Sequence, residues 1–236
     1  RYPLVLGLVA ALAACSPKGD ALYARAEKAL AEGDVSAAII DLKNYVEADP
    51  QDAKGRALLG AALVQSGDMQ AGEIELRKAT DLGAPPQMLL VPECKLLAAK
   101  GEYDAVLARC APDSAPATER ADLLISRGQA YSGLKRLDDA RVSFEAAAAE
   151  RPGSLEAWVG LAAVTHASSG VDAAKAVLEK APATVKDDAR YWLTLGGIEA
   201  SGGSLVAAEA AFATALGKTA AGNRGSNRLE PLAAVG

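Results

Sequence analysis

The sequence contains one histidine, three cysteines and few aromatic residues among its 236 residues. Catalysis by a Ser/His or Cys/His pair would depend on His166 alone, and a metal site would lack histidine ligands. Lys and Arg form no cluster and the net charge is −5, which argues against the basic stripe of a nucleic-acid-binding protein. The many alanines favour helices that pack closely through small side chains. We therefore expect a non-catalytic protein with no metal, cofactor, nucleic acid or small-molecule substrate.

The first fifteen residues have the features of a secretory signal peptide. Arg1 supplies a positive charge, and the apolar run over residues 4–14 is too short to span a bilayer, which takes about 20 residues. The run ends in Leu12-Ala13-Ala14-Cys15, which resembles the lipobox of bacterial lipoprotein precursors. The alternative is an ordinary Ala-x-Ala cleavage site that happens to precede a cysteine. We expect residues 1–15 to be a lipoprotein signal ending at a lipidated Cys15.

Two further expectations follow from this end of the chain. Ser16 follows the cysteine, and by analogy with Gram-negative sorting it suggests an outer-membrane lipid anchor facing the periplasm. The lipid anchor is then the only contact with the membrane that we expect. The sequence does not begin with Met, so we expect a few further residues upstream.

A glycine followed by an acidic residue recurs every 34 residues, at Gly33, Gly67 and Gly101. We expect residues 16–18 to be a tether and residues 19–216 to hold six repeats. Residues 217–236, rich in Gly and Asn at first, are expected to be a linker and the start of a further repeat. No polar capping element is visible, so we expect the chain to be the front of a longer protein. The periods are 19–52, 53–86, 87–120, 121–154, 155–188 and 189–222.

The repeats share small residues at positions eight, twenty and twenty-seven and mostly large ones at position twenty-four. Position eight is where two antiparallel helices can approach closely, and position twenty-four fills the space towards the next repeat. This pattern resembles the tetratricopeptide repeat (TPR), a pair of antiparallel helices. It predicts an all-α TPR solenoid, a right-handed superhelix of about six helix hairpins. Position eight reads Ala26, Gly60, Cys94, Gly128, Ala162, Gly196, and position twenty-four reads Leu42, Leu76, Cys110, Phe144, Leu178, Phe212.

The third repeat departs from the pattern. Pro92 falls inside its first helix, and residues 111–118 read as a loop that shortens its second helix. Cys94 and Cys110 occupy positions that lie level on the two helices, so we expect them to form a disulfide in an oxidising periplasm. The alternative is that both are free cysteines serving as small apolar residues, with Cys94 packed against Val106.

Several segments resemble a particular group of repeat proteins. Examples are Ala21-Leu22-Tyr23-Ala24-Arg25-Ala26 and, further on, Leu82-Gly83-Ala84-Pro85-Pro86 followed by Leu90-Val91-Pro92. Over most of residues 12–180 the chain resembles the TPR-repeat lipoproteins of the PEP-CTERM/exosortase system (the PrsT family). The resemblance implies a role in the Gram-negative envelope that is linked to exopolysaccharide production and the handling of PEP-CTERM proteins.

In a TPR superhelix, positions two, five, nine and twelve of the first helix line a concave groove. Position five is apolar in every repeat, which suits an amphipathic helix or an extended peptide. We expect a protein or peptide ligand there; the alternative is that these are ordinary groove residues and the contact lies elsewhere. His166 is expected to be a solvated groove residue. The residues are Tyr23, Glu27, Lys54, Val91, Lys95, Ile125, Gln129, Glu156, Val159, His166, Arg190 and Leu193, with Ala57 completing position five.

Three functions compete at this point. The first is a scaffold for export or polysaccharide assembly in the envelope, and the second is a pilotin-like lipoprotein that assists an outer-membrane secretin. An enzyme is the third, and it would need a clustered acid/base set that the sequence does not show. A chain with many more repeats favours the first, whereas a stop near Gly236 favours the second.

Overall fold

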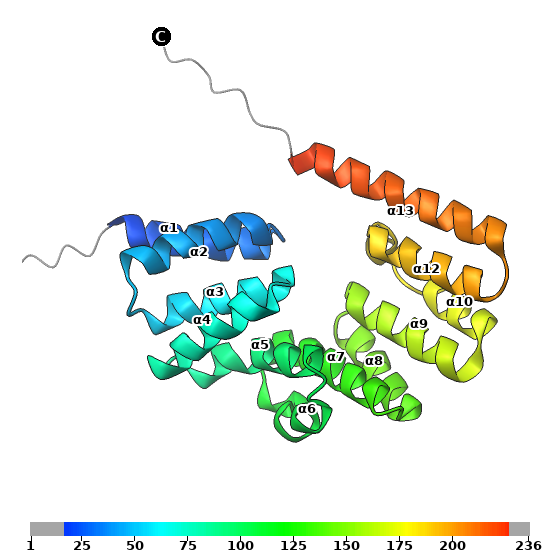
Figure 1. The fold of residues 1–236 in the computed structure, drawn as a ribbon, viewed down its shortest axis with the longest axis horizontal. Helices are drawn as coiled ribbons and strands as arrows, with labels where there is room; N and C mark the ends of the chain where they lie inside the picture. The colour runs from blue at the N-terminus through cyan, green and yellow to red at the C-terminus, as the bar shows by residue number, and fades with distance from the viewer. Residues whose placement is uncertain (1–16, 227–236) are drawn as a thin grey trace, which may run out of the picture. The chain divides into compact units, whose positions relative to one another are not determined.

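The computed structural model describes residues 17–226, and every regular element in that part of the chain is helical (Figure 1). Cys15 and the rest of the expected signal peptide lie outside the described residues. The elements are α1 Pro17–Ala31, α2 Val35–Ala48, α3 Ala53–Ser66, α4 Met69–Asp81, α5 Pro86–Ala99, α6 Tyr103–Arg109, the 3₁₀ helix η1 Pro112–Ser114, α7 Ala117–Gly133, α8 Leu137–Glu150, α9 Leu155–Ser169, α10 Val171–Glu179, α11 Ala183–Lys186, α12 Ala189–Ser201 and α13 Leu205–Ser226.

The helices divide into two compact units. Unit 1 ends at Pro92 and holds the hairpins α1/α2 and α3/α4, and unit 2 begins at Glu93 and holds α7/α8, α9/α10 and α12/α13 as well as α6. The boundary falls inside α5, which continues through Pro92 as a helix. Within each unit, the two helices of a hairpin pack along each other, and the second helix packs against the first helix of the following hairpin.

The recurring glycine and acidic residue form the turn inside the hairpin. Gly33 and Gly67 have φ angles of 82° and 93°, in the left-handed region that ends a helix at little cost for glycine. The carboxylates of Asp34 and Asp68 then accept hydrogen bonds from the first turns of α2 and α4, from Ala37 N at 3.0 Å and Ala71 N at 3.1 Å. The two-residue signature therefore ends one helix and begins the next.

Glycines at the helix contacts leave room for large side chains. The Phe144 ring on α8 is 3% exposed and lies between Gly128 on α7 and Gly160 on α9. A Cβ added to Gly128 would lie 2.8 Å from that ring, and one added to Gly160 would lie 2.4 Å away. These separations are shorter than van der Waals contact, so the two glycines set how closely α7 and α9 approach α8.

The core of each unit consists largely of alanines and aliphatic residues at the repeat positions. In unit 1, Ala26, Ala38 and Leu42 pack with Leu59 and Leu63 across two hairpins. In unit 2, the clusters follow one another along the hairpins, and Trp158 and Val177 contact both of them. Within each unit, neighbouring hairpins therefore share a core, as expected for stacked repeats.

Two expected segment boundaries are wrong. Residues 16–18 are not all tether, because α1 already begins at Pro17, and proline suits the first position of a helix. Residues 217–226 are not a linker, because α13 continues to Ser226. The segment itself has more glycines than alanines, but it continues a helix that is rich in alanine from Leu205 onwards, and alanine has the highest helix propensity. Residues 227–236 lie outside the described part of the chain.

The second helices of two hairpins are short. The first, α6, spans only Tyr103–Arg109 and is followed by η1, as the loop expected over residues 111–118 implies. The second, α10, ends at Glu179 and was not anticipated. Pro182 follows, and it lacks the N–H that a continuing helix would need, so a separate short helix, α11, begins after it.

Replacing Gly160 by Ala is expected to destabilise the protein by about 1–3 kcal/mol, because the new methyl group would meet the enclosed Phe144 ring. Gly197→Ala is the matched control, since a Cβ at this exposed position in α12 meets nothing within 4 Å. Helix propensity should make that control up to about 1 kcal/mol more stable. Urea unfolding followed by circular dichroism measures both variants, and a Gly160→Ala protein as stable as wild type would contradict the packing described.

Candidate protein-binding face

The first helices of successive hairpins lie side by side in unit 2, where α9 contacts both α7 and α12. Together with the part of α5 from Glu93 onwards, they carry seven of the expected groove residues at least partly exposed to solvent. We call this surface the A face of unit 2. Its members are Lys95, Gln129, Glu156, Val159, His166, Arg190 and Leu193.

Polar contacts connect α9 and α12 across the A face. Arg190 Nη1 lies 3.0 Å from Glu156 Oε1, and Arg190 Nη2 lies 3.0 Å from an oxygen of Asp188, the N-cap of α12. Burial alone would raise the pKa of Asp188, but hydrogen bonds from Arg190 lower it below its usual value. Leu193, one turn along α12, is 51% exposed beside this charged pair. The face therefore combines an exposed apolar side chain with fixed charges.

A second polar group joins α5, α7 and the end of α8. Asp122 accepts from Lys95 Nζ at 2.7 Å and from Arg151 Nη2 at 2.6 Å. Burial alone would raise the pKa of the Asp122 carboxyl, but the Arg151 hydrogen bond and the charge of Lys95 outweigh it and lower the pKa. The Lys95 ammonium group therefore pairs with Asp122 of the same chain, although part of the Lys95 side chain remains exposed to solvent.

His166 on α9 lies within hydrogen-bonding distance of Ser201 on α12. Ser201 Oγ lies 2.9 Å from His166 Nε2, and the same oxygen lies 2.7 Å from the carbonyl oxygen of Ile198. A hydroxyl has one proton, and donating it to the carbonyl leaves Oγ to accept from the imidazole. The contact therefore connects α9 to α12.

The expected apolar floor is incomplete. Ile125 is only 6% exposed and belongs to the core around Phe144, and Ala57 is buried in unit 1. The prediction that Ile125 contacts a partner is therefore wrong, because the close approach of the helices covers position five at these repeats. Val159 is half-buried and Leu193 is exposed, so position five can reach a ligand on α9 and α12.

In unit 1, Glu27 and Lys54 are exposed on α1 and α3, and Val91 is half-buried on α5. The Tyr23 ring packs against the Tyr45 ring with centroids 5.3 Å apart, and burial raises the pKa of Tyr23. The Tyr45 hydroxyl donates to Asp52, the N-cap of α3. Tyr23 is therefore part of the packing between the first two hairpins, with only part of its surface available.

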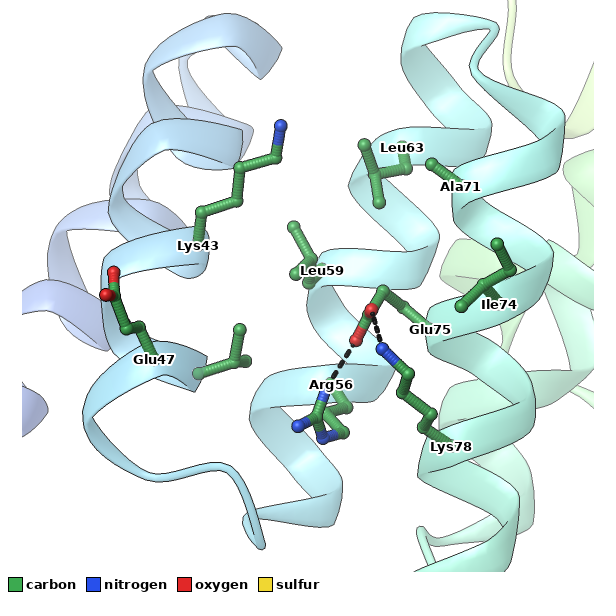
Figure 2. A pocket seen from close by; sticks show the side chains of 10 residues that line it. Lys43, Glu47, Arg56, Leu59, Leu63, Ala71, Ile74, Glu75 and Lys78 are labelled. Atoms are coloured by element: carbon green, nitrogen blue, oxygen red, sulfur yellow. Dashed lines mark hydrogen bonds and ion pairs between the residues drawn. The ribbon is translucent and has the colours of Figure 1, made fainter.

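The structure also has a shallow pocket that the sequence did not indicate. In unit 1 it has a volume of about 350 Å³ between α2, α3 and α4, and Figure 2 shows Arg56 reaching Glu75, which also meets Lys78. A similar pocket of about 340 Å³ lies between α8, α9 and α10 in unit 2. Arg56 and Trp158 occupy position four of their repeats, so this pocket recurs with the period of the hairpins.

Cys94 on α5 and Cys110 after α6 are joined in the structure, with Sγ atoms 2.06 Å apart and Cα atoms 6.0 Å apart. Both side chains are almost fully buried. A nearby ion pair between Glu93 and Arg109, at 2.8 Å, also connects α5 to the end of α6. A covalent link therefore connects the two helices of the short third hairpin, with Cys110 at the position where the other repeats have a large side chain.

Residues 132–198 match the family described as Tetratricopeptide repeat. Residues 132–198 run from the end of α7 to α12, and they include α8, α9 and α10 with the contact between Phe144 and Gly160. No curated protein matches the chain in sequence.

Solved structures with TPR-like folds are similar to most of this chain. PilW, a widely conserved type IV pilus biogenesis factor, is 15% identical with a TM-score of 0.58, over 85% of this chain and 93% of that one. Pseudomonas aeruginosa PilF is 17% identical with a TM-score of 0.53, over 82% and 88%. Human IFIT1, solved as a dimer with PPP-AAAA, is 18% identical with a TM-score of 0.66 over 85% of this chain, which spans about half of its length.

The all-α TPR-like solenoid predicted from the sequence is confirmed. TPR solenoids generally bind protein partners through their exposed helix faces and are not catalytic. Among residues 17–226, no group of three or more His, Cys, Asp or Glu side chains is arranged to hold a metal ion. No helix in the same range is both long and apolar enough to cross a bilayer.

The link between Cys94 and Cys110 is expected to form in the mature protein and to stabilise it by roughly 3 kcal/mol, from the entropy of closing a loop of 16 residues. Thiol counting on denatured, unreduced protein should then find neither cysteine free. Reduction should lower the unfolding midpoint, and it should have no such effect on a Cys94→Ala, Cys110→Ala double variant. Two free thiols per chain, with Cys15 acylated, would show that the bridge is absent.

Proposed function

We propose that this protein is a non-catalytic scaffold that binds a protein or peptide on the A face of unit 2. The observation that carries the proposal is the exposed Leu193, which lies beside the fixed Glu156–Arg190 pair on a row of TPR first helices. An exposed apolar side chain gains from burial against a partner, and the neighbouring charges favour partners of complementary charge. Val159 on the adjacent helix would extend the apolar contact.

We also propose a specific role for this scaffold, in PEP-CTERM/exosortase-linked export or exopolysaccharide assembly. Support comes from the sequence, where the segments around Tyr23 and Pro86 resemble the PrsT family. A lipobox at Cys15 supports anchoring at the outer membrane, facing the periplasm, where such an assembly would act. In this role the array would hold an envelope protein near the membrane.

A pilotin-like role is the second candidate. The observation that favours it is the similarity of fold to PilW, described as a type IV pilus biogenesis factor, and to Pseudomonas aeruginosa PilF. Both match this chain over most of their own length, so the number of hairpins is comparable. In this role the ligand would be a secretin subunit or another part of an envelope machine.

Site-specific crosslinking tests the binding face and separates the two candidates. A photo-crosslinking amino acid in place of Leu193, in the bacterium that encodes the protein, should give a discrete adduct. The same residue in place of Val142, which is 58% exposed on α8, is the matched control and should not give it. Mass spectrometry of the adduct then assigns it to an exosortase-linked component or to a secretin subunit.

Three outcomes would contradict the proposed face. Equal adducts from Leu193 and Val142 would indicate contact without a preferred surface, and an adduct from Val142 alone would move the interface to the second helices. The absence of any adduct from Leu193, with the variant protein present at normal levels, would also reject the A face of unit 2.

Cys15 is expected to carry the lipid. Cells grown with labelled palmitate should label the protein, and Cys15→Ser should abolish the label and release the protein from the membrane fraction. Ser16→Ala keeps the cysteine and serves as the control that should retain the label. Persistent labelling of Cys15→Ser would reject lipidation at this residue.

A further inference from the structure

The unit 1 pocket, between α2, α3 and α4, lies between two complete hairpins of the described chain. Leu59 and Leu63 line it from α3 and are buried, whereas Ile74 lines it from α4 and is 45% exposed. Figure 2 shows Ile74 on one wall and Lys43 and Glu47 on the other, with Leu59 between the walls. The exposure of Ile74 therefore follows from how α2 and α4 flank α3, and an end of the chain is not its cause.

The charges at one end of the pocket already have partners. Arg56 Nη1 lies 2.7 Å from Glu75 Oε2, and Arg56 Nε donates to the carbonyl oxygen of Pro50 at 2.7 Å. Lys78 Nζ lies 2.7 Å from the other oxygen of Glu75. These groups connect α3 to α4, and because they are paired they add little attraction for a charged ligand.

The wall formed by α2 carries two charges that are available to a ligand. Lys43 and Glu47 are exposed and lie four residues apart, on the same side of the helix. Lys before Glu is the less favourable order for an ion pair within a helix, and neither side chain has a polar partner among the described residues. The same positions of the unit 2 pocket have Glu145, which Arg141 holds at 3.0 Å, and Ala149. The free pair of charges therefore distinguishes the unit 1 pocket.

The apolar lining of the pocket determines which kind of backbone can lie over it. An extended peptide would lose water from its N–H and C=O groups above Val46, Leu59 and Ile74, whose side chains offer no hydrogen bond in return. A helix satisfies these groups internally and presents only side chains to the pocket. Lys43 and Glu47, about one turn apart, then match an acidic and a basic residue four places apart on a helix that lies along α2.

We propose that the unit 1 pocket binds an amphipathic helix of a partner protein. Its apolar side chains enter the pocket, and an acidic and a basic residue, four places apart, face Lys43 and Glu47. Residues 1–16 of this chain do not provide such a helix, because they contain no acidic residue. The pocket belongs to unit 1 and the proposed A face belongs to unit 2, so either can fail without the other.

A designed peptide provides the probe. It is an alanine-rich helix with a leucine in each turn and with Glu and Lys four places apart beside the leucines. A hydrocarbon link holds it helical, because short isolated helices are marginal in water. One control peptide has Lys at both charged places, and a second keeps Glu and Lys but has alanine in place of every leucine.

The isoleucine δ1-methyl NMR signals of the full chain report where the peptide binds. The chain has five isoleucines, of which Ile74 lines the pocket. Ile40 occupies the same repeat position on α2, is 62% exposed and does not line the pocket. Its signal is therefore the matched control for non-specific contact with an exposed apolar side chain.

The Glu/Lys peptide should shift the Ile74 signal in a saturable way and leave the Ile40 signal unchanged. The Lys/Lys peptide should bind about fivefold more weakly, since an exposed ion pair contributes up to about that factor. The peptide without leucines should cause no shift. The variant Lys43→Glu makes both wall charges acidic, and it has the residue type that unit 2 has at Glu145. In this variant the Lys/Lys peptide should bind more tightly than the Glu/Lys peptide.

Four results would overturn the proposal. The first is no saturable shift of the Ile74 signal in a folded chain, and the second is an equal shift of the Ile40 and Ile74 signals. The third is an unchanged order of affinities in Lys43→Glu, which would mean that the peptide binds elsewhere. The fourth is an Ile74 signal that moves with the concentration of the protein alone, which would assign the pocket to a second copy of this chain.

Discussion

The contact between a large side chain and a glycine determines how these helices are spaced. At Phe144, two helices approach one ring so closely that neither could carry a Cβ at the point of contact. Such contacts gain dispersion energy from both sides of the ring, and they also fix the distance between the helix axes. Alanine elsewhere in the interface serves the same purpose, which explains a core with Phe144 as its one buried phenylalanine among the described residues. The 34-residue period is the length of chain needed to repeat this contact.

Where that contact is missing, a different interaction connects the helices. The third hairpin has Cys94 and Cys110 at the two positions that Gly128 and Phe144 occupy in the fourth, and the structure joins them covalently. Its second helix is short and offers little surface for packing, so a covalent link compensates for lost burial. Because each repeat contacts mainly its neighbours, such a local replacement leaves the other hairpins unchanged.

The sequence predicted the features that repeat and missed those that depend on a single repeat. The helix pairs, the glycine turns and the positions with small residues occur in several repeats. Each of these predictions therefore rests on several copies of the same pattern. The early end of α10 precedes a single proline, Pro182, and α13 extends through residues 217–226 although glycines outnumber alanines there. The burial of Ile125 follows from how closely neighbouring first helices pack, and a pattern of residue types does not contain that distance. Ion pairs such as Asp122 with Arg151 join residues far apart in sequence and were not foreseen.

The packing of the hairpins also decides which side chains remain for a partner. On the A face of unit 2, Arg190 and Glu156 already neutralise each other, so this pair contributes little long-range attraction and mainly defines the orientation of a ligand. The affinity there must come from burying Leu193 and Val159, two modest side chains.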